Sequence, residues 1–149
     1  MKNYLLAAIL IASLVVVGFK SPPGSADVRV TELLPKPRTT RQFVELLNTG
    51  RRSINIAKFR LETANGQKYT FPAGTWVKSG QYLAFYTDAT GLDLSQRCDY
   101  LKLFNKHNQL INQSPQYCQP PSGQAWAKHT KTWQWSKPTP NQANDDPLW

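Results

Sequence analysis

Few side chains in this sequence have the types and spacing that catalysis or metal binding requires. The candidates are two carboxylates in apolar segments, Glu32 and Glu45, two histidines, His107 and His129, and one pair of cysteines. Both histidines fall in loop-like sequence, and the cysteines lack the C-x₂₋₄-C spacing of a zinc site. The sequence also lacks a phosphate-binding glycine loop and a G-x-S-x-G nucleophile motif. We therefore expect no catalytic residue, metal, cofactor or small-molecule substrate; the competing hypothesis is an enzyme without a recognisable motif.

The two glutamates lie in segments that otherwise read as buried strands. As a pair, Glu32 and Glu45 have the chemistry for acid–base catalysis or cation binding. A buried charge must be compensated, however, and a carboxylate is compensated most simply by backbone N–H groups or an arginine. We expect both glutamates to be structural, each accepting hydrogen bonds from loop backbone or pairing with an arginine.

The amino-terminal residues have the organisation of a secretory signal peptide. Lys2 precedes an apolar run from Tyr4 to Phe19, and the small residues Gly24, Ser25 and Ala26 follow. The pattern predicts a signal peptide over residues 1–26, cleaved after Ala26, and a secreted or cell-surface protein. The run would span about 24 Å as a helix, less than the ~30 Å of a bilayer core. The alternative is a single-pass membrane anchor, and membrane contact is expected only if this segment is retained.

Cys98 and Cys118 are the only cysteines of the chain. Export would place them in an oxidising compartment. The segments 101–104 and 109–111 read as a hairpin, which places Cys98 opposite residues 114–116, a few positions from Cys118. Pro115 gives a reason for a bulge that absorbs this offset. We expect a disulfide; two free buried thiols are the alternative.

Basic residues give the 149-residue chain a net charge of +9. This charge favours acidic partners such as nucleic acid, anionic lipid or an acidic polymer. Lys36, Arg38 and Arg41 share one predicted loop, and Arg51 and Arg52 share another. These five residues are the candidates for binding an anionic ligand. Consecutive loops of a sandwich alternate between its ends, which argues against one patch, and a solvated basic surface without a partner is the alternative.

The segments between the loops read as short strands. Turn signals such as Asn65-Gly66 recur at intervals of roughly 8–12 residues, which is typical of an antiparallel sandwich of seven or eight strands. In the first strand, Val28 and Val30 share one face with Glu32 by strict alternation. In segment 54–61 the apolar alternation changes phase between positions 56 and 59, which predicts a bulge or a bend between sheets. We assign residues 27–144 to one domain and residues 145–149 to a short tail.

Three of the five tryptophans lie near the carboxyl end of this domain. Trp133 and Trp135 are two positions apart and therefore share one face of a strand. Pro138 and Pro140 cannot donate to a sheet, so the chain leaves the sheet there. We expect this segment to be the closing strand of the core, with Trp126 docking separately.

Several ordered motifs resemble those of the lamin tail domain family. They are residues 30–37 (VTELLPKP), 42–50 (QFVELLNTG), 71–75 (FPAGT), 79–83 (SGQYL), 123–127 (GQAWA), 133–135 (WQW), 138–141 (PTPN) and Asn144. The resemblance implies an all-β, immunoglobulin-like antiparallel β-sandwich of the bacterial secreted or surface type. Phe59 stands where the family has tryptophan, and Asn141 where it has glycine; asparagine tolerates the left-handed conformation that such a glycine would adopt.

The same resemblance implies a non-catalytic binding or adhesion module, since such domains accompany secreted nucleases, DNA-uptake proteins and surface proteins. We expect a protein or an acidic polymer, DNA among them, as the partner. The alternative function is extracellular nucleic-acid binding, in which the basic loops contact the phosphate backbone. A sandwich fold hosts many functions, so the fold does not choose between them.

Overall fold

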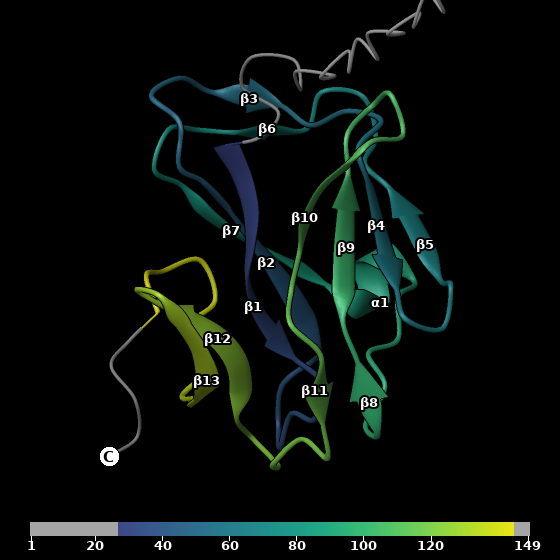
Figure 1. Cartoon of the computed structure of the whole chain (residues 1–149), viewed down its shortest axis with the longest axis vertical. Coiled ribbons are helices and arrows are strands. Elements are labelled where there is room, and N and C mark those ends of the chain that lie inside the picture. The colour runs from purple at the N-terminus through teal and green to yellow at the C-terminus, as the bar shows by residue number, and fades with distance from the viewer. Residues whose placement is uncertain (1–26, 145–149) are drawn as a thin grey trace, which may run out of the picture.

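The computed structural model describes residues 27–144, which form two layers of antiparallel strands (Figure 1). The predicted signal peptide (1–26) and tail (145–149) lie outside the described residues. The elements are β1 (Val28–Leu34), β2 (Phe43–Asn48), β3 (Ile54–Asn55), β4 (Arg60–Thr63), β5 (Lys68–Thr70), β6 (Trp76–Val77), β7 (Tyr82–Tyr86), α1 (Thr87–Thr90), β8 (Cys98–Asp99), β9 (Leu101–Phe104), β10 (Leu110–Gln113), β11 (Tyr117–Cys118), β12 (Ala125–His129) and β13 (Thr132–Ser136).

One layer is a five-stranded sheet in the order β13-β12-β1-β2-β7, and the other is a four-stranded sheet in the order β10-β9-β4-β5. The short pairs β3–β6 and β8–β11 extend opposite ends of the molecule (Figure 1). Without these four two-residue strands the two sheets contain nine strands, one more than the seven or eight expected. The helix α1 is four residues long, too short to leave a helical period in the sequence.

The core lies between the two sheets. Leu33 and Val44 from the five-stranded sheet and Leu61 and Leu103 from the four-stranded sheet are fully buried in one cluster. Phe71 joins this cluster and makes edge contacts with the rings of Tyr69 and Phe85. Apolar residues from both layers therefore meet in a single core, which confirms the antiparallel β-sandwich.

A bulge in β1 reverses the expected orientation of Glu32. The register of β1 against β2 shifts between Val30 and Glu32, which makes Thr31 the extra residue. Because one inserted residue moves every later side chain to the other face, Leu33 joins Val28 and Val30 in the core. Glu32 lies on the outer face of the five-stranded sheet, so the expectation that it shares a face with Val28 and Val30 was wrong.

The predicted phase change in segment 54–61 is a bend between sheets. β3 pairs with β6, whereas β4 pairs with β5 and β9. Lys58 has a φ of 65°, a left-handed conformation that turns the chain between the two strands. Ile56, Phe59 and Leu61 are all buried as a result.

The carboxyl-terminal hairpin brings the three tryptophans together. Trp126 on β12 lies directly opposite Trp135 on β13. The ring of Trp126 is 5.2 Å from that of Trp135 and 6.1 Å from that of Trp133, and all three are half-buried against the core. Trp133 and Trp135 share a face as predicted. The expectation that Trp126 docks separately was wrong, because only the turn at Thr130 joins the two strands.

Cys98 and Cys118 form the predicted disulfide. They lie directly opposite each other in the β8–β11 pair. The register of β9 against β10 shifts at Ile111, and Pro115 interrupts the strand before β11 begins. Together these irregularities supply the offset that a regular hairpin lacks.

Candidate functional site

The five basic residues predicted to bind an anion lie at opposite ends of the sandwich. In the antiparallel pair β1–β2, Leu34 lies opposite Phe43 at one end, and Val28 lies opposite Asn48 at the other. Loop 35–42 follows the first end and loop 49–53 the second. Six residues of extended strand separate them, or about 20 Å. The structure therefore brings Lys36, Arg38 and Arg41 together in one place and Arg51 with Arg52 in another, without forming a single patch.

The chain crosses the outer face of the five-stranded sheet after β13, and we call residues 137–144 the strap. Thr139 donates from its backbone N–H (2.9 Å) and its hydroxyl (3.0 Å) to the carboxylate of Glu32. The Asn141 N–H donates to Glu45 (2.8 Å), and the Asn141 side chain accepts from the N–H of Ala84 on β7 (2.8 Å). The Asn144 amide donates to the carbonyls of Thr31 and Lys128. The strap is thereby attached to four neighbouring strands.

Glu32 and Glu45 lie opposite each other on β1 and β2, fully buried beneath the strap. Glu45 also accepts a hydrogen bond from the hydroxyl of Thr31 (2.9 Å). Burial, followed by the negative charge of Glu32, raises the pKa of Glu45 to about 8. Loop backbone N–H groups donate to both carboxyls, as predicted, and no solvent-facing oxygen remains for acid–base chemistry. The pair is an attachment point for the strap. Asn141 there has a φ of 65°, the expected left-handed conformation.

A pocket of about 320 Å³, open to solvent on one side, lies between the strap and loop 35–42. Its apolar floor consists of Leu34 and Phe43, which are buried, and the half-exposed ring of Tyr86. The other residues that line it are Pro37, Arg38, Thr39, Thr40, Gly123, Lys137, Pro138 and Pro140. Pro138 and Pro140, which sequence analysis assigned to a structural signature, are thus part of the wall of a cavity.

Two cationic side chains, Arg38 and Lys137, border this pocket, and the charge of a third, Arg41, is neutralised by an acidic residue. Arg41 forms an ion pair with Asp88 (2.6 Å) and lies 4.5 Å over the ring of Tyr86. Arg38 donates from Nε to the carbonyl of Ser122 (3.3 Å), and within residues 27–144 neither it nor Lys137 forms an ion pair. The pocket therefore presents an apolar floor and two positive charges.

Gly123 is the residue that lets Arg38 lie along the pocket wall. Its φ is +78°, and a Cβ added there would lie 2.9 Å from the Cγ of Arg38. Its N–H also donates to the carbonyl of Lys36 (2.7 Å). Any larger residue at position 123 would displace the arginine and strain the turn.

The other end of the sandwich carries Arg51 and Arg52 beside two residues that sequence analysis missed. The Asn48 amide donates to the carbonyls of Arg52 (2.8 Å) and Val77 (2.9 Å), which fixes loop 49–53 against the end of β6. Lys78 follows β6 directly, and Trp76 on β6 is 53% exposed. The sequence W-V-K could have predicted this pair. If Val77 is buried, the alternation of a strand places the side chains of Trp76 and Lys78 on the exposed face.

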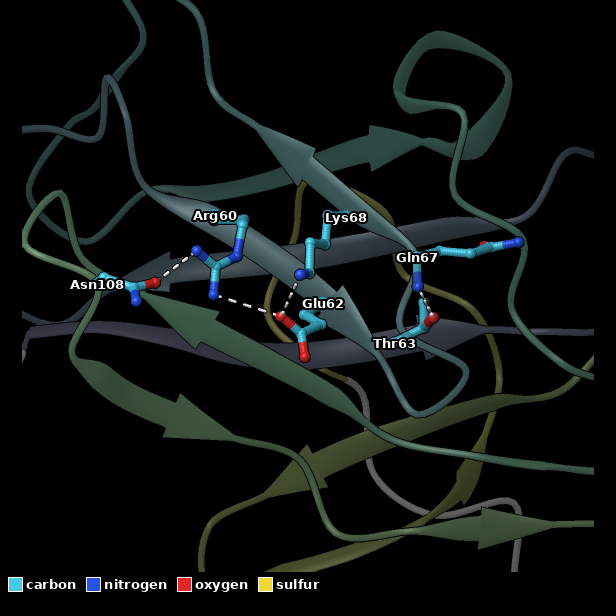
Figure 2. Close-up of polar contacts among 6 residues, drawn as sticks. All are labelled: Arg60, Glu62, Thr63, Gln67, Lys68 and Asn108. Carbon is cyan, nitrogen blue, oxygen red and sulfur yellow. Dashed lines mark hydrogen bonds and ion pairs between the residues drawn. The ribbon is translucent and has the colours of Figure 1, made fainter.

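The charges of a third group, on the outer face of the four-stranded sheet, pair with one another (Figure 2), although within residues 27–144 the buried Nε of Arg60 has no hydrogen-bond partner. Arg60 donates to Glu62 (3.3 Å) and to the side chain of Asn108 (2.5 Å), and its guanidinium lies 4.3 Å over the ring of Phe104. Lys68 approaches Glu62 at 4.0 Å. These contacts connect β4, β5 and the β9–β10 turn, so we assign this group a structural role.

Lys137 was missed at the pocket end because no local pattern shows that the strap returns over the sheet. His107 lies in the β9–β10 turn and His129 at the end of β12, and the structure does not bring them together. Among residues 27–144, no group of three histidine, cysteine or acidic side chains is placed to hold a metal ion. No helix in that range is long and apolar enough to cross a membrane.

A family model described as Lamin Tail Domain matches residues 21–118, about two thirds of the chain. The matched residues include all elements from β1 to β11. The strands β12 and β13 and the strap lie after the match. No curated protein matches this sequence.

Proposed function

The chain belongs to the lamin tail domain family, and we propose that it is a non-catalytic binding or adhesion module that acts outside the cytoplasm. Domains of this family are immunoglobulin-like β-sandwiches and are generally not catalytic, and residues 27–144 have that architecture. The Cys98–Cys118 disulfide supports an oxidising compartment. The signal-peptide pattern of residues 1–26 supports export.

The observation that carries the binding role is the pocket between loop 35–42 and the strap. An apolar floor of aromatic and aliphatic side chains with a few convergent polar groups is the usual character of a binding site. Arg38 and Lys137 at its border add charge complementarity to a carboxylate. We propose that the pocket receives an extended protein segment in which an apolar side chain lies next to an acidic residue.

A displayed library of short random peptides tests this proposal. Selection on the full chain should enrich peptides with an apolar residue beside Asp or Glu. Thr40→Trp should block the enriched peptides by filling the pocket, because Thr40 is exposed on its wall. Ser53→Trp, an exposed residue at the opposite end, is the matched control. Failure to enrich peptides, or equal binding to both variants, contradicts the proposal.

The second candidate function is nucleic-acid binding by the basic loops, favoured by the net charge of +9. Because the loops lie about 20 Å apart, only two or three cations at one end would contact phosphates at a time. The logarithm of duplex-DNA affinity should then fall with the logarithm of salt concentration with a slope of about −2 to −3. Titration of duplex DNA at two salt concentrations gives this slope. Undetectable binding at the lower concentration rejects the function.

A further inference from the structure

The end of the sandwich at which the chain enters the domain is a compact basic surface, which we call the entry face. It consists of Asp27, Arg51, Arg52, Trp76 and Lys78. The N–H and hydroxyl of Thr49 both donate to the carbonyl of Asp27 at 2.9 Å. The Ser79 hydroxyl donates to the carbonyl of Gly50 (2.6 Å). Loops 49–53 and 78–81 are thereby held beside the start of β1, at the top of Figure 1.

Trp76 is the most prominent apolar group of this face. Its side chain is 53% exposed, and it is one of two large hydrophobic residues that the described part of the chain leaves exposed. It lies opposite Asn55 in the β3–β6 pair, while the adjacent Val77 is buried. The tryptophan is therefore held by a fixed backbone, and its ring points away from the core.

The charged residues around Trp76 are predominantly basic. The segments 49–59, 71–81 and 105–109, which meet at this end, contain five basic residues and no acidic residue: Arg51, Arg52, Lys58, Lys78 and Lys106. Asp27 is the only acid of the entry face. Tryptophan beside lysine and arginine is the combination found where proteins meet the headgroup region of a membrane.

We propose that the entry face rests on an anionic lipid surface, with Trp76 at headgroup depth and Arg51, Arg52 and Lys78 on lipid phosphates. The position of the chain entry favours lipid over other polyanions. The apolar run ending at Phe19 is joined to Asp27 by seven residues, which reach at most about 25 Å. While that run occupies a bilayer, before the predicted cleavage or in a chain that retains it as an anchor, the entry face lies within this distance of the headgroups. This contact is independent of the pocket at the other end.

The test uses the full chain in the form that cells produce, with vesicles of phosphatidylcholine alone or mixed with phosphatidylglycerol. Each basic residue near an anionic surface contributes roughly five-fold in affinity. The triple variant Arg51→Gln, Arg52→Gln, Lys78→Gln should therefore bind the anionic vesicles about 100-fold more weakly. In wild type, a lipid-attached quencher should reduce tryptophan fluorescence, and Trp76→Phe should abolish that reduction. If the chain retains the apolar run, insertion of that run would mask a change in vesicle affinity. The quenching of Trp76 fluorescence still reports the contact in that case.

The matched control neutralises three exposed cations at the pocket end: Lys36→Gln, Arg38→Gln, Lys137→Gln. It should leave vesicle binding within a few-fold of wild type. An equal loss in both triple variants would show an unspecific charge effect and overturn the proposal. Quenching that is absent, or that survives Trp76→Phe, also overturns it. So does tight binding of a single-stranded oligonucleotide at the entry face without vesicle binding, which would assign the face to nucleic acid.

Discussion

The two ends of the sandwich carry similar numbers of loop cations but use them differently. At the pocket end Arg41 is paired with Asp88 and Arg38 lies along the pocket wall, so the charges border an apolar cavity. At the entry face the cations surround an exposed tryptophan, and Asp27 is the only acid. The two ends therefore differ in the acidic neighbours and the apolar groups beside their cations, and not in the number of arginines and lysines.

The largest expected effect is at the pocket end, where Trp135 packs against Trp126 and Tyr117. Trp135→Ala should lower the free energy of unfolding by about 3 kcal/mol, the low end for a tryptophan because the ring is half-buried. That loss is a large share of the ~5–15 kcal/mol of a domain. Urea denaturation measures it. A variant as stable as wild type would mean that these rings form a surface platform and not part of the core. Trp76→Ala, at the entry face, should change stability little.

The attachment of the strap should be the next most sensitive feature. Thr139→Val keeps the shape of the side chain and removes the hydroxyl that donates to Glu32. Because a hydrogen bond to a buried charged group is lost, stability should fall by about 2 kcal/mol. Peptide binding at the pocket should weaken as the prolines of the strap shift, whereas vesicle binding should not change. Thr139→Ser retains the hydroxyl and is the control; equal behaviour of the two variants would contradict this role.

The Glu32–Glu45 pair makes the stability of the strap depend on pH. Folding raises the pKa of Glu45 from an ordinary value of 4.5 to about 8, so the folded chain binds this proton more tightly than the unfolded chain. The contribution of Glu45 to stability is therefore greatest below pH 4.5 and is lost as the pH rises toward 8. Thermal melts across this range should show the decline. Glu45→Gln should flatten it, while Glu62→Gln on the other sheet should not. An unchanged slope in Glu45→Gln would contradict the assignment.

The smallest effect tests whether acidic neighbours separate the two ends. Asp88→Asn removes the partner of Arg41, an exposed pair that contributes about 0.2–1 kcal/mol at most. Folding stability should hardly change. The pocket end should gain one free cation, and an acidic peptide selected on the pocket should bind a few-fold more tightly in an equilibrium titration. Weaker binding would mean that Arg41 acts only while paired with Asp88.

Sequence patterning predicted the features that depend on local order. The strand and turn periodicity, the hairpin at Asn65-Gly66, the shared face of Trp133 and Trp135, and the disulfide all follow from residues close to one another along the chain. The predicted placement of loops 35–42 and 49–53 at opposite ends followed from the alternation of connections in a sandwich.

What the sequence did not predict depends on contacts between distant residues. Thr139 reaches Glu32 across a separation of 107 positions, and no local pattern indicates that the strap returns over the sheet. The pocket, the role of Lys137 and the attachment of Asn141 all follow from that return. The bulge at Thr31 was not predicted for a similar reason. The strap buries the outer face of β1, so both faces of this strand are buried and the sequence does not show which residues face the core.

We propose that the two ends are separate binding surfaces, and a double dissociation distinguishes this arrangement from one diffuse basic surface. The measurement compares two charge-neutralised pairs, Arg38→Gln with Lys137→Gln and Arg51→Gln with Arg52→Gln. Each is titrated with a pocket-selected peptide and with phosphatidylglycerol vesicles. We expect that the first pair weakens only peptide binding and the second only vesicle binding. If each pair weakens both by similar factors, the basic residues act as one diffuse charge and the claim is wrong.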